Sequence, residues 1–269
     1  MCTAYQQIKK LDNANQLNDF AEQLLRLKAK RRSRPEMPLL LPNLVVKTIP
    51  GCGTGQHIRL LAQLLEEEGL LLFNGEEKVF EWIITQEDVS FDPLLGRVQA
   101  AGGIYGSFCG VVVVELSAAL QNPWPASFLR LRDYVAAQQG RIMFVFLVPI
   151  NTASDLIQQL LVDLSCRTPL AVIDIPWLSD DCAVSYITDE LKKRGLSVNK
   201  DVPQLIGNTL RQITSHPNFR GYHTLQSLVD EFTWYVASRK RKDLHINPKD
   251  ANGLLKTYLD AFRRRTPWR

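Results

Sequence analysis

The chain has 269 residues, of which 45% are hydrophobic and 22% charged, and its formal net charge is +4. This length and composition provide a sizeable core, in one large domain or two modest ones. No run of about 18 apolar residues occurs and the N-terminus lacks a secretory signal, so no membrane contact is expected. The five cysteines are scattered and the four histidines isolated, so we expect a reduced, cytoplasmic protein without a metal site.

Strands and helices alternate along the first part of the chain. The predicted elements are, in order, a helix over 13–30, a strand over 44–49, a helix to about 68, a strand over 78–85, a helix near 93–101, a strand over 110–116, a helix over 122–139, a strand over 141–148, a helix over 151–164 and a strand over 170–175. Short β-branched runs such as GVVVVEL (110–116) indicate strands buried on both faces.

The alternation predicts an α/β fold with a five-stranded parallel sheet, right-handed crossovers and helices on both faces. No strand is predicted after Pro176. The remainder is predicted to be helical, over 180–194, 201–215, 224–240 and 248–265.

A glycine-rich turn follows the first predicted strand and precedes an apolar helix. The turn, Pro50–Gly55 (PGCGTG), is called the glycine loop below. A strand, a glycine-rich turn and a helix in this order predict a phosphate site, because backbone N–H groups and the helix N-terminus point at the anion. Against the usual G-x-x-x-x-G-K-[ST] pattern, Pro50 replaces the first Gly, Gln56 the Lys and His57 the Ser/Thr.

The candidate site is therefore a phosphate loop in shape, without the charge and the metal-binding hydroxyl. The predicted nucleotide-binding residues are Gly51, Cys52, Gly53, Thr54, Gly55, Gln56 and His57. No catalytic or metal-ligating residue is predicted. Cys52 has no His–Asp relay in the sequence, so we interpret it as a buried, unreactive thiol.

The element order and the G-T-G core of the glycine loop resemble an AAA+ ATPase module, over about residues 40–240. The segments LPNLVV, PGCGTG and GVVVVEL are similar to bacterial proteins of that family. The resemblance implies that ATP binds between the sheet and a helical lid, and that subunits form rings. The expected partition is an N-terminal helix and basic linker (1–38), an α/β core (39–178), a helical lid (179–242) and a basic C-terminal helix (243–269).

Under this resemblance, the positions that carry charge or base chemistry differ from the family's pattern. The family's lysine neutralises phosphates and its Ser/Thr binds magnesium, where this chain has Gln56 and His57. The family's third strand ends in Asp-Glu, where this chain has Glu115 and Leu116. A leucine cannot serve as a base.

Three further family positions have counterparts. Asn151 or Thr152 matches the polar sensor after the fourth strand. Arg167 matches an arginine finger, although a cation near a helix C-terminus explains it equally well. His223 stands where the lid's sensor arginine is expected.

Basic residues gather in three runs, within 28–34, 239–242 and 263–269. These runs are explained either as solvated helix ends or as contacts to nucleic-acid phosphates. The leading hypothesis is a degenerate AAA+-like assembly or interaction subunit that does not hydrolyse ATP, binds ATP or ADP weakly, and has a protein partner or forms a homo-oligomer. The alternatives are an ATPase that uses Glu115 and Arg167, and a nucleic-acid-binding module that uses the basic runs.

Overall fold

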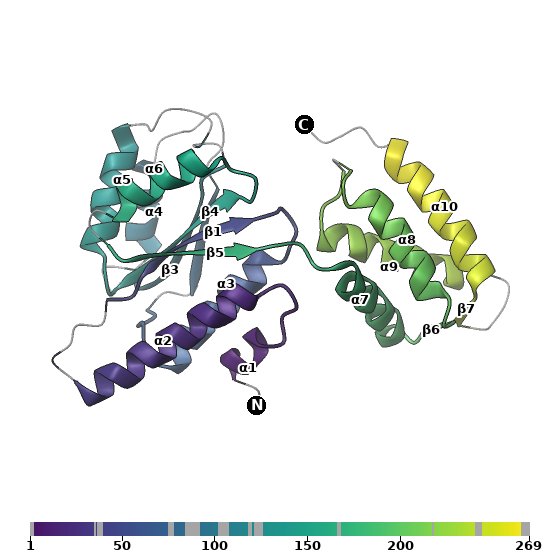
Figure 1. Cartoon of the computed structure of the whole chain (residues 1–269), viewed down its shortest axis with the longest axis horizontal. Coiled ribbons are helices and arrows are strands. Elements are labelled where there is room, and N and C mark those ends of the chain that lie inside the picture. The colour runs from purple at the N-terminus through teal and green to yellow at the C-terminus, as the bar shows by residue number, and fades with distance from the viewer. Residues whose placement is uncertain are drawn as a thin grey trace. The chain divides into compact units, whose positions relative to one another are not determined.

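The computed structural model separates the chain into two compact units (Figure 1). It describes residues 3–34, 36, 40–74, 78–83, 92–101, 108–117, 120, 126–165, 168–216, 218–239 and 244–264. The first unit is Met1–Ile49 with Thr54–Pro176, and the second is Pro50–Gly53 with Trp177–Arg269. Part of the glycine loop thus groups with the C-terminal unit.

The first unit contains a parallel five-stranded sheet, as the sequence predicts. Its strands are β1 (Asn43–Thr48), β2 (Val79–Ile83), β3 (Gly110–Glu115), β4 (Ile142–Pro149) and β5 (Leu170–Ile175). Their order across the sheet is β2-β3-β4-β1-β5. β1 lies between two other strands, and its Val45 is paired with Phe146 on one side and Val172 on the other. The glycine loop therefore follows an interior strand of the sheet.

Helices cover both faces of the sheet (Figure 1). Those of the first unit are α1 (Ala4–Ile8), α2 (Asn15–Ser33), α3 (Thr54–Glu67), α4 (Asp92–Ala101), α5 (Ala126–Ala137) and α6 (Ser154–Ser165). Helices α4, α5 and α6 pack on one face, where the core includes Val98, Phe128, Leu160 and Phe144. Helices α2 and α3 lie on the other face. The short helix α1, absent from the predicted elements, begins with a capping box between Thr3 and Gln6.

The second unit is a helical bundle with its own core. Its elements are α7 (Asp180–Lys193), β6 (Ser197–Val198), α8 (Val202–Ile213), α9 (Tyr222–Ala237), β7 (His245–Ile246) and α10 (Pro248–Arg264). All four helices contribute to one apolar cluster, in which Ile187, Ile206, Phe232 and Leu255 are buried. The C-terminal helix α10 is thus part of this bundle.

The prediction of no strand after Pro176 is wrong in one detail. β6 and β7 form a parallel pair, with Ser197 opposite His245 and Val198 opposite Ile246. Each strand has two residues, too few to produce an alternating apolar pattern. No helix in the described part of the chain is long and apolar enough to span a membrane.

Candidate nucleotide site

The glycine loop begins where β1 ends and stops as α3 starts. Gly51 and Gly53 have φ angles of +82° and +86°, which residues with a Cβ rarely adopt. Thr48, the last residue of β1, and Thr54, the first residue of α3, are joined by a hydrogen bond between their hydroxyls, 2.5 Å apart. This contact ties the strand end to the helix start. The predicted strand–loop–helix order is present.

Within the second unit, the loop is bonded to the start of α9. The Gly51 carbonyl accepts the Tyr222 N–H at 2.9 Å. A Cβ added to Gly51 would lie 2.2 Å from the Arg220 carbonyl oxygen, and one added to Gly221 would lie 2.2 Å from the Gly51 oxygen. No side chain fits at either position without displacing backbone, so glycine is required on both sides of this contact.

Gln56 and His57, which the expected resemblance matches with a lysine and a Ser/Thr, occupy different environments. His57, near the start of α3, is only 2% exposed, whereas Gln56 before it is not buried. His57 Nε2 lies 2.9 Å from Asn13 Oδ1, and Asn13 Nδ2 donates to the Pro176 carbonyl at 2.8 Å. His57 therefore joins α3 to the segment before α2, and Asn13 joins that segment to the residue after β5. These contacts explain how a polar ring is accommodated in the interior.

The end of β3 places an acid beside a buried leucine. The Ser117 hydroxyl donates to Glu115 Oε1 at 3.0 Å, and Glu115 is partly exposed. Leu116 is fully buried in the core of the sheet, and its N–H donates to the Leu147 carbonyl at 2.9 Å. Leu116, which the expected resemblance matches with a glutamate, is therefore an apolar core residue. Glu115 is the carboxylate that this strand end presents.

Asn151 and Thr152 follow β4, and His223 lies at the start of α9. Asn151 is exposed, and the Thr152 hydroxyl donates to the Pro149 carbonyl at 2.7 Å, within the turn after β4. His223 is exposed in the first turn of α9. Cys52 is buried and is not part of a disulfide. Arg167 lies outside the described residues.

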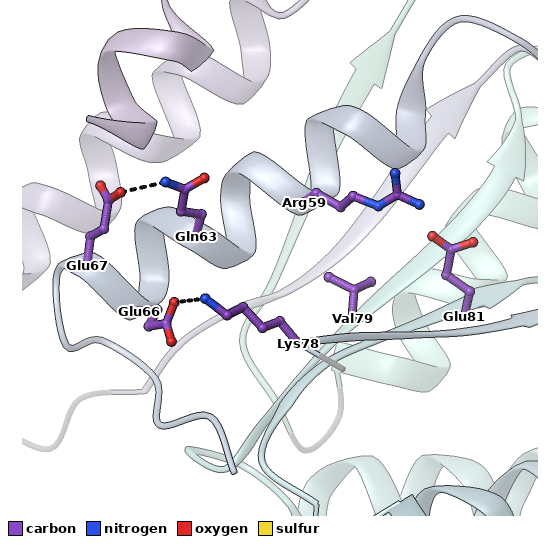
Figure 2. A pocket seen from close by; sticks show the side chains of 7 residues that line it. All are labelled: Arg59, Gln63, Glu66, Glu67, Lys78, Val79 and Glu81. Carbon is purple, nitrogen blue, oxygen red and sulfur yellow. Dashed lines mark hydrogen bonds and ion pairs between the residues drawn. The ribbon is translucent and has the colours of Figure 1, made fainter. Parts of the chain in front are cut away.

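A pocket of about 710 Å³ lies elsewhere in the first unit, between α3 and β2 (Figure 2). Its described lining residues are Arg59, Gln63, Glu66, Glu67, Lys78, Val79 and Glu81, and none belongs to residues 50–57. Lys78 is paired with Glu66, and Gln63 Nε2 donates to Glu67 at 2.7 Å. Much of the polar lining is thus satisfied by neighbouring groups, and its mixed charge favours neither anions nor cations.

Two structural residues were missed by sequence reasoning. Asn13 is the first residue of the predicted helix over 13–30, and nothing in its surroundings in the sequence pairs it with His57. Gly221 lies between the predicted helices over 201–215 and 224–240, where its φ is +57° and it contacts Gly51. The glycine offered a signal, because a Gly directly before a helix can mark a close backbone approach. The asparagine offered none.

The chain has a parallel sheet of order β2-β3-β4-β1-β5, a glycine loop after β1 and a helical second unit, a fold similar to that of solved AAA+ proteins. The structures similar to this chain include the RuvB Holliday junction branch migration motor of Thermotoga maritima. It is 11% identical with a TM-score of 0.53, over 89% of this chain and 68% of RuvB. A mutant form of that protein gives a TM-score of 0.55 at 11% identity, over the same shares of the two chains.

At this level of identity the likeness concerns the fold alone. No model of a protein family and no curated protein matches the chain. The expected resemblance to an AAA+ module is confirmed as a statement about the fold. Function must be argued from the residues of the site, since one fold hosts many activities.

Proposed function

We propose that the chain is a P-loop module that does not hydrolyse ATP efficiently, binds ATP or ADP at most weakly, and acts as an assembly or interaction subunit. One observation carries the proposal, namely the buried hydrogen bond between His57 and Asn13. In the sequence resemblance, His57 stands where the family has the hydroxyl that binds magnesium. A ring nitrogen held in the interior is a poor substitute for the small oxygen ligand that Mg²⁺ requires.

Two further positions support the same conclusion. Gln56 can donate a hydrogen bond but carries no charge, and uncharged donors bind phosphate less strongly than cations do. Leu116 is buried and cannot accept a proton from an attacking water. Losing a general base costs roughly 10²–10⁴ in rate. Together these differences support slow or absent turnover and weak binding.

The test is calorimetric titration of the full chain with ATP and ADP, with and without Mg²⁺. We expect weak or undetectable binding by the unmodified chain. Gln56→Lys should tighten ATP binding at least about tenfold, because a charge-assisted hydrogen bond contributes about 1.5–3 kcal/mol. Gln56 is not buried, so this substitution does not disturb the core. The matched control is Gln159→Lys, which adds the same charge at an exposed position of α6 and should leave ATP binding unchanged.

The result that overturns the proposed binding is micromolar, magnesium-dependent affinity in the unmodified chain. In that case the alternative, a working ATPase, becomes the better account. Glu115, the carboxylate at the end of β3, would then be the group to test. Turnover that disappears in Glu115→Ala would assign the chemistry to this residue. If the Gln56→Lys variant and the unmodified chain bind ATP equally well, the missing charge at Gln56 is not the cause of weak binding.

The assembly role is supported by a large exposed aromatic side chain in the second unit. Trp234 on α9 is 69% exposed, and tryptophan is enriched in protein interfaces. We expect sedimentation velocity to show self-association, or co-sedimentation with a catalytically active P-loop homologue. Trp234→Ala should weaken that association. A chain that stays monomeric alone and in the mixture would contradict the assembly role.

A further inference from the structure

A small pocket in the second unit differs in charge from the pocket between α3 and β2. It has a volume of about 150 Å³. Its described lining residues are Asn218, Arg220, His223, Thr224, Ser227, Tyr258 and Phe262, contributed by α9, by the segment before it and by α10. No acidic side chain is among these residues. The pocket therefore combines a guanidinium, an imidazole and hydroxyl groups without a counter-charge.

The two basic side chains at this pocket have no ion-pair partner among the described residues. Arg220 and His223 are both exposed. The Arg220 backbone is fixed, because its N–H donates to the Thr224 hydroxyl at 2.8 Å. The Tyr258 hydroxyl, contributed by α10, donates to the Thr224 carbonyl at 3.3 Å. The backbone around the pocket is thus held in place while the guanidinium of Arg220 remains open to solvent.

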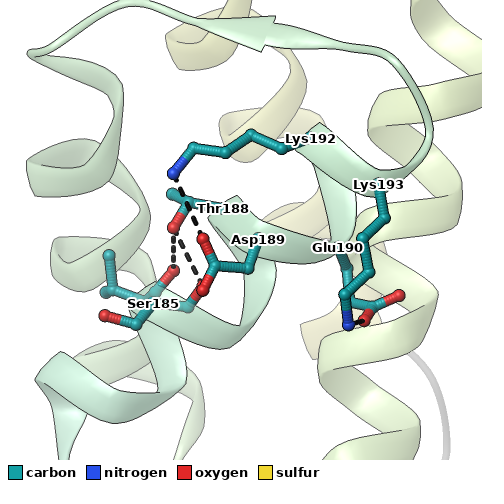
Figure 3. A network of polar contacts seen from close by, with 7 residues as sticks. Ser185, Thr188, Asp189, Glu190, Lys192 and Lys193 are labelled. Atoms are coloured by element: carbon teal, nitrogen blue, oxygen red, sulfur yellow. Dashed lines mark hydrogen bonds and ion pairs between the residues drawn. The ribbon is translucent and has the colours of Figure 1, made fainter.

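Several other cations of the same unit are paired with acids. Arg194 lies 2.7 Å from Asp230, and Arg239 lies 3.0 Å from Asp250. On α7, Lys192 bonds Asp189 at 3.1 Å and Lys193 bonds Glu190 at 2.6 Å (Figure 3). Such pairs neutralise their own field, so α7 offers little attraction for an anion. The pocket at Arg220 and His223 therefore differs from α7, where the named cations lie beside acids.

The positive charge continues onto the end of α10. Asn218 Nδ2 donates to the Phe262 carbonyl at 3.2 Å, which holds the end of α10 beside the pocket. Arg263 and Arg264 follow directly, and both are exposed. Arg263 makes a hydrogen bond to Gln212 Oε1 at 3.1 Å, with its charge uncompensated by any described acid. A single phosphate would need one cationic pocket, whereas a row of cations suits a ligand with repeated phosphates.

We propose that this pocket, flanked by Arg263 and Arg264, binds the phosphate backbone of a nucleic acid. The Arg220 guanidinium supplies a planar pair of donors that matches two phosphate oxygens. His223 and Ser227 supply further donors at the rim. Backbone contacts of this kind carry no sequence information, so binding is expected to be insensitive to base sequence and to fall steeply with salt. The proposal does not depend on the glycine loop.

The test measures binding of the full chain to labelled single-stranded and duplex DNA by fluorescence anisotropy, over a range of salt concentrations. Replacing both of these pocket side chains, Arg220→Gln with His223→Gln, should weaken DNA binding at least about tenfold. The slope of log affinity against log salt should fall by about one for each lost phosphate contact. Ser227→Asp, which places a carboxylate at the lining, should weaken binding as well.

The matched control is Lys192→Gln with Lys193→Gln, which removes two full charges from α7 of the same unit. If net charge alone governed binding, this control would lose at least as much affinity as the pocket variant. We expect it to bind DNA nearly as tightly as the unmodified chain. Equal losses in the two double variants would overturn the proposal, as would absent DNA binding. If the chain binds inorganic phosphate or ATP but neither single-stranded nor duplex DNA, the proposal that the ligand is a nucleic acid is wrong.

Discussion

His57 lies in the first turn of α3, and its Nε2 is 2.9 Å from Asn13 Oδ1. Both residues are buried, at 2% and 5% exposure. Leaving a buried polar group without its hydrogen-bond partner lowers the free energy of unfolding by about 1–3 kcal/mol, because the group is not solvated by water. The conformation of the first unit therefore depends on this histidine for a reason unrelated to magnesium. That dependence can be measured as stability rather than as activity.

We expect His57→Leu to lower the free energy of unfolding by about 1–3 kcal/mol, because Asn13 Oδ1 loses a partner in the interior. Urea unfolding checks this value. Gln56→Leu, one residue earlier and not buried, should change stability by less than about 0.5 kcal/mol. Asn13→Leu combined with His57→Leu should cost less than the two single changes added together, since neither polar group is then left alone. A His57→Leu variant as stable as the unmodified chain would contradict the structural role.

At the scale of elements, the start of α9 depends on backbone geometry that only glycine provides. Gly221 has a φ of +57°, and a Cβ there would lie 2.2 Å from the Gly51 carbonyl oxygen. The Gly51 carbonyl also accepts the Tyr222 N–H. A change at Gly221 therefore strains the helix start and separates it from the glycine loop at the same time.

Gly221→Ala should destabilise the chain by more than about 1 kcal/mol, because alanine neither adopts the positive φ easily nor fits against Gly51. Thermal unfolding is the measurement. Gly253→Ala is the matched control, since a Cβ at this exposed position of α10 meets nothing within 4 Å. The control should be neutral, or more stable by roughly 0.5–1 kcal/mol, as expected for alanine in a helix interior. Identical melting temperatures for Gly221→Ala and the unmodified chain would refute the steric argument.

The same elements show what the sequence could and could not predict. The strand β3 was predictable because five of its six residues are buried, and an unbroken β-branched run signals that environment. The glycine loop was predictable because a positive φ restricts the residue type locally. The His57–Asn13 bond was not, because it joins residues 44 positions apart and follows from packing alone. Features that depend on neighbouring residues could thus be predicted from the sequence, whereas a hydrogen bond between residues far apart in the sequence could not.

At the scale of the whole molecule, each unit carries a tyrosine whose partial burial affects its ionisation. Tyr134 packs against the core of the first unit, where its ring meets Phe144 edge-on. Tyr186 packs in the second unit, and its hydroxyl donates to Gln226 Oε1 at 3.1 Å. In both residues, burial raises the pKa above the ordinary value for tyrosine, and in Tyr186 the nearby carboxylate of Glu190 raises the pKa further. Each unit thus prefers the neutral phenol more strongly than the unfolded chain does.

These raised pKa values predict that the chain loses stability in alkali. Below about pH 10, the ordinary tyrosine pKa, both phenols are neutral in the folded and unfolded states and their contribution is fully present. As pH rises through the higher folded pKa values, the unfolded state ionises first and stability falls. Thermal unfolding from about pH 8 to about pH 11, a range that spans the ordinary pKa, should show this decline. Tyr186→Phe and Tyr134→Phe should each flatten it. A decline unchanged in both core variants would assign the alkaline loss to other groups.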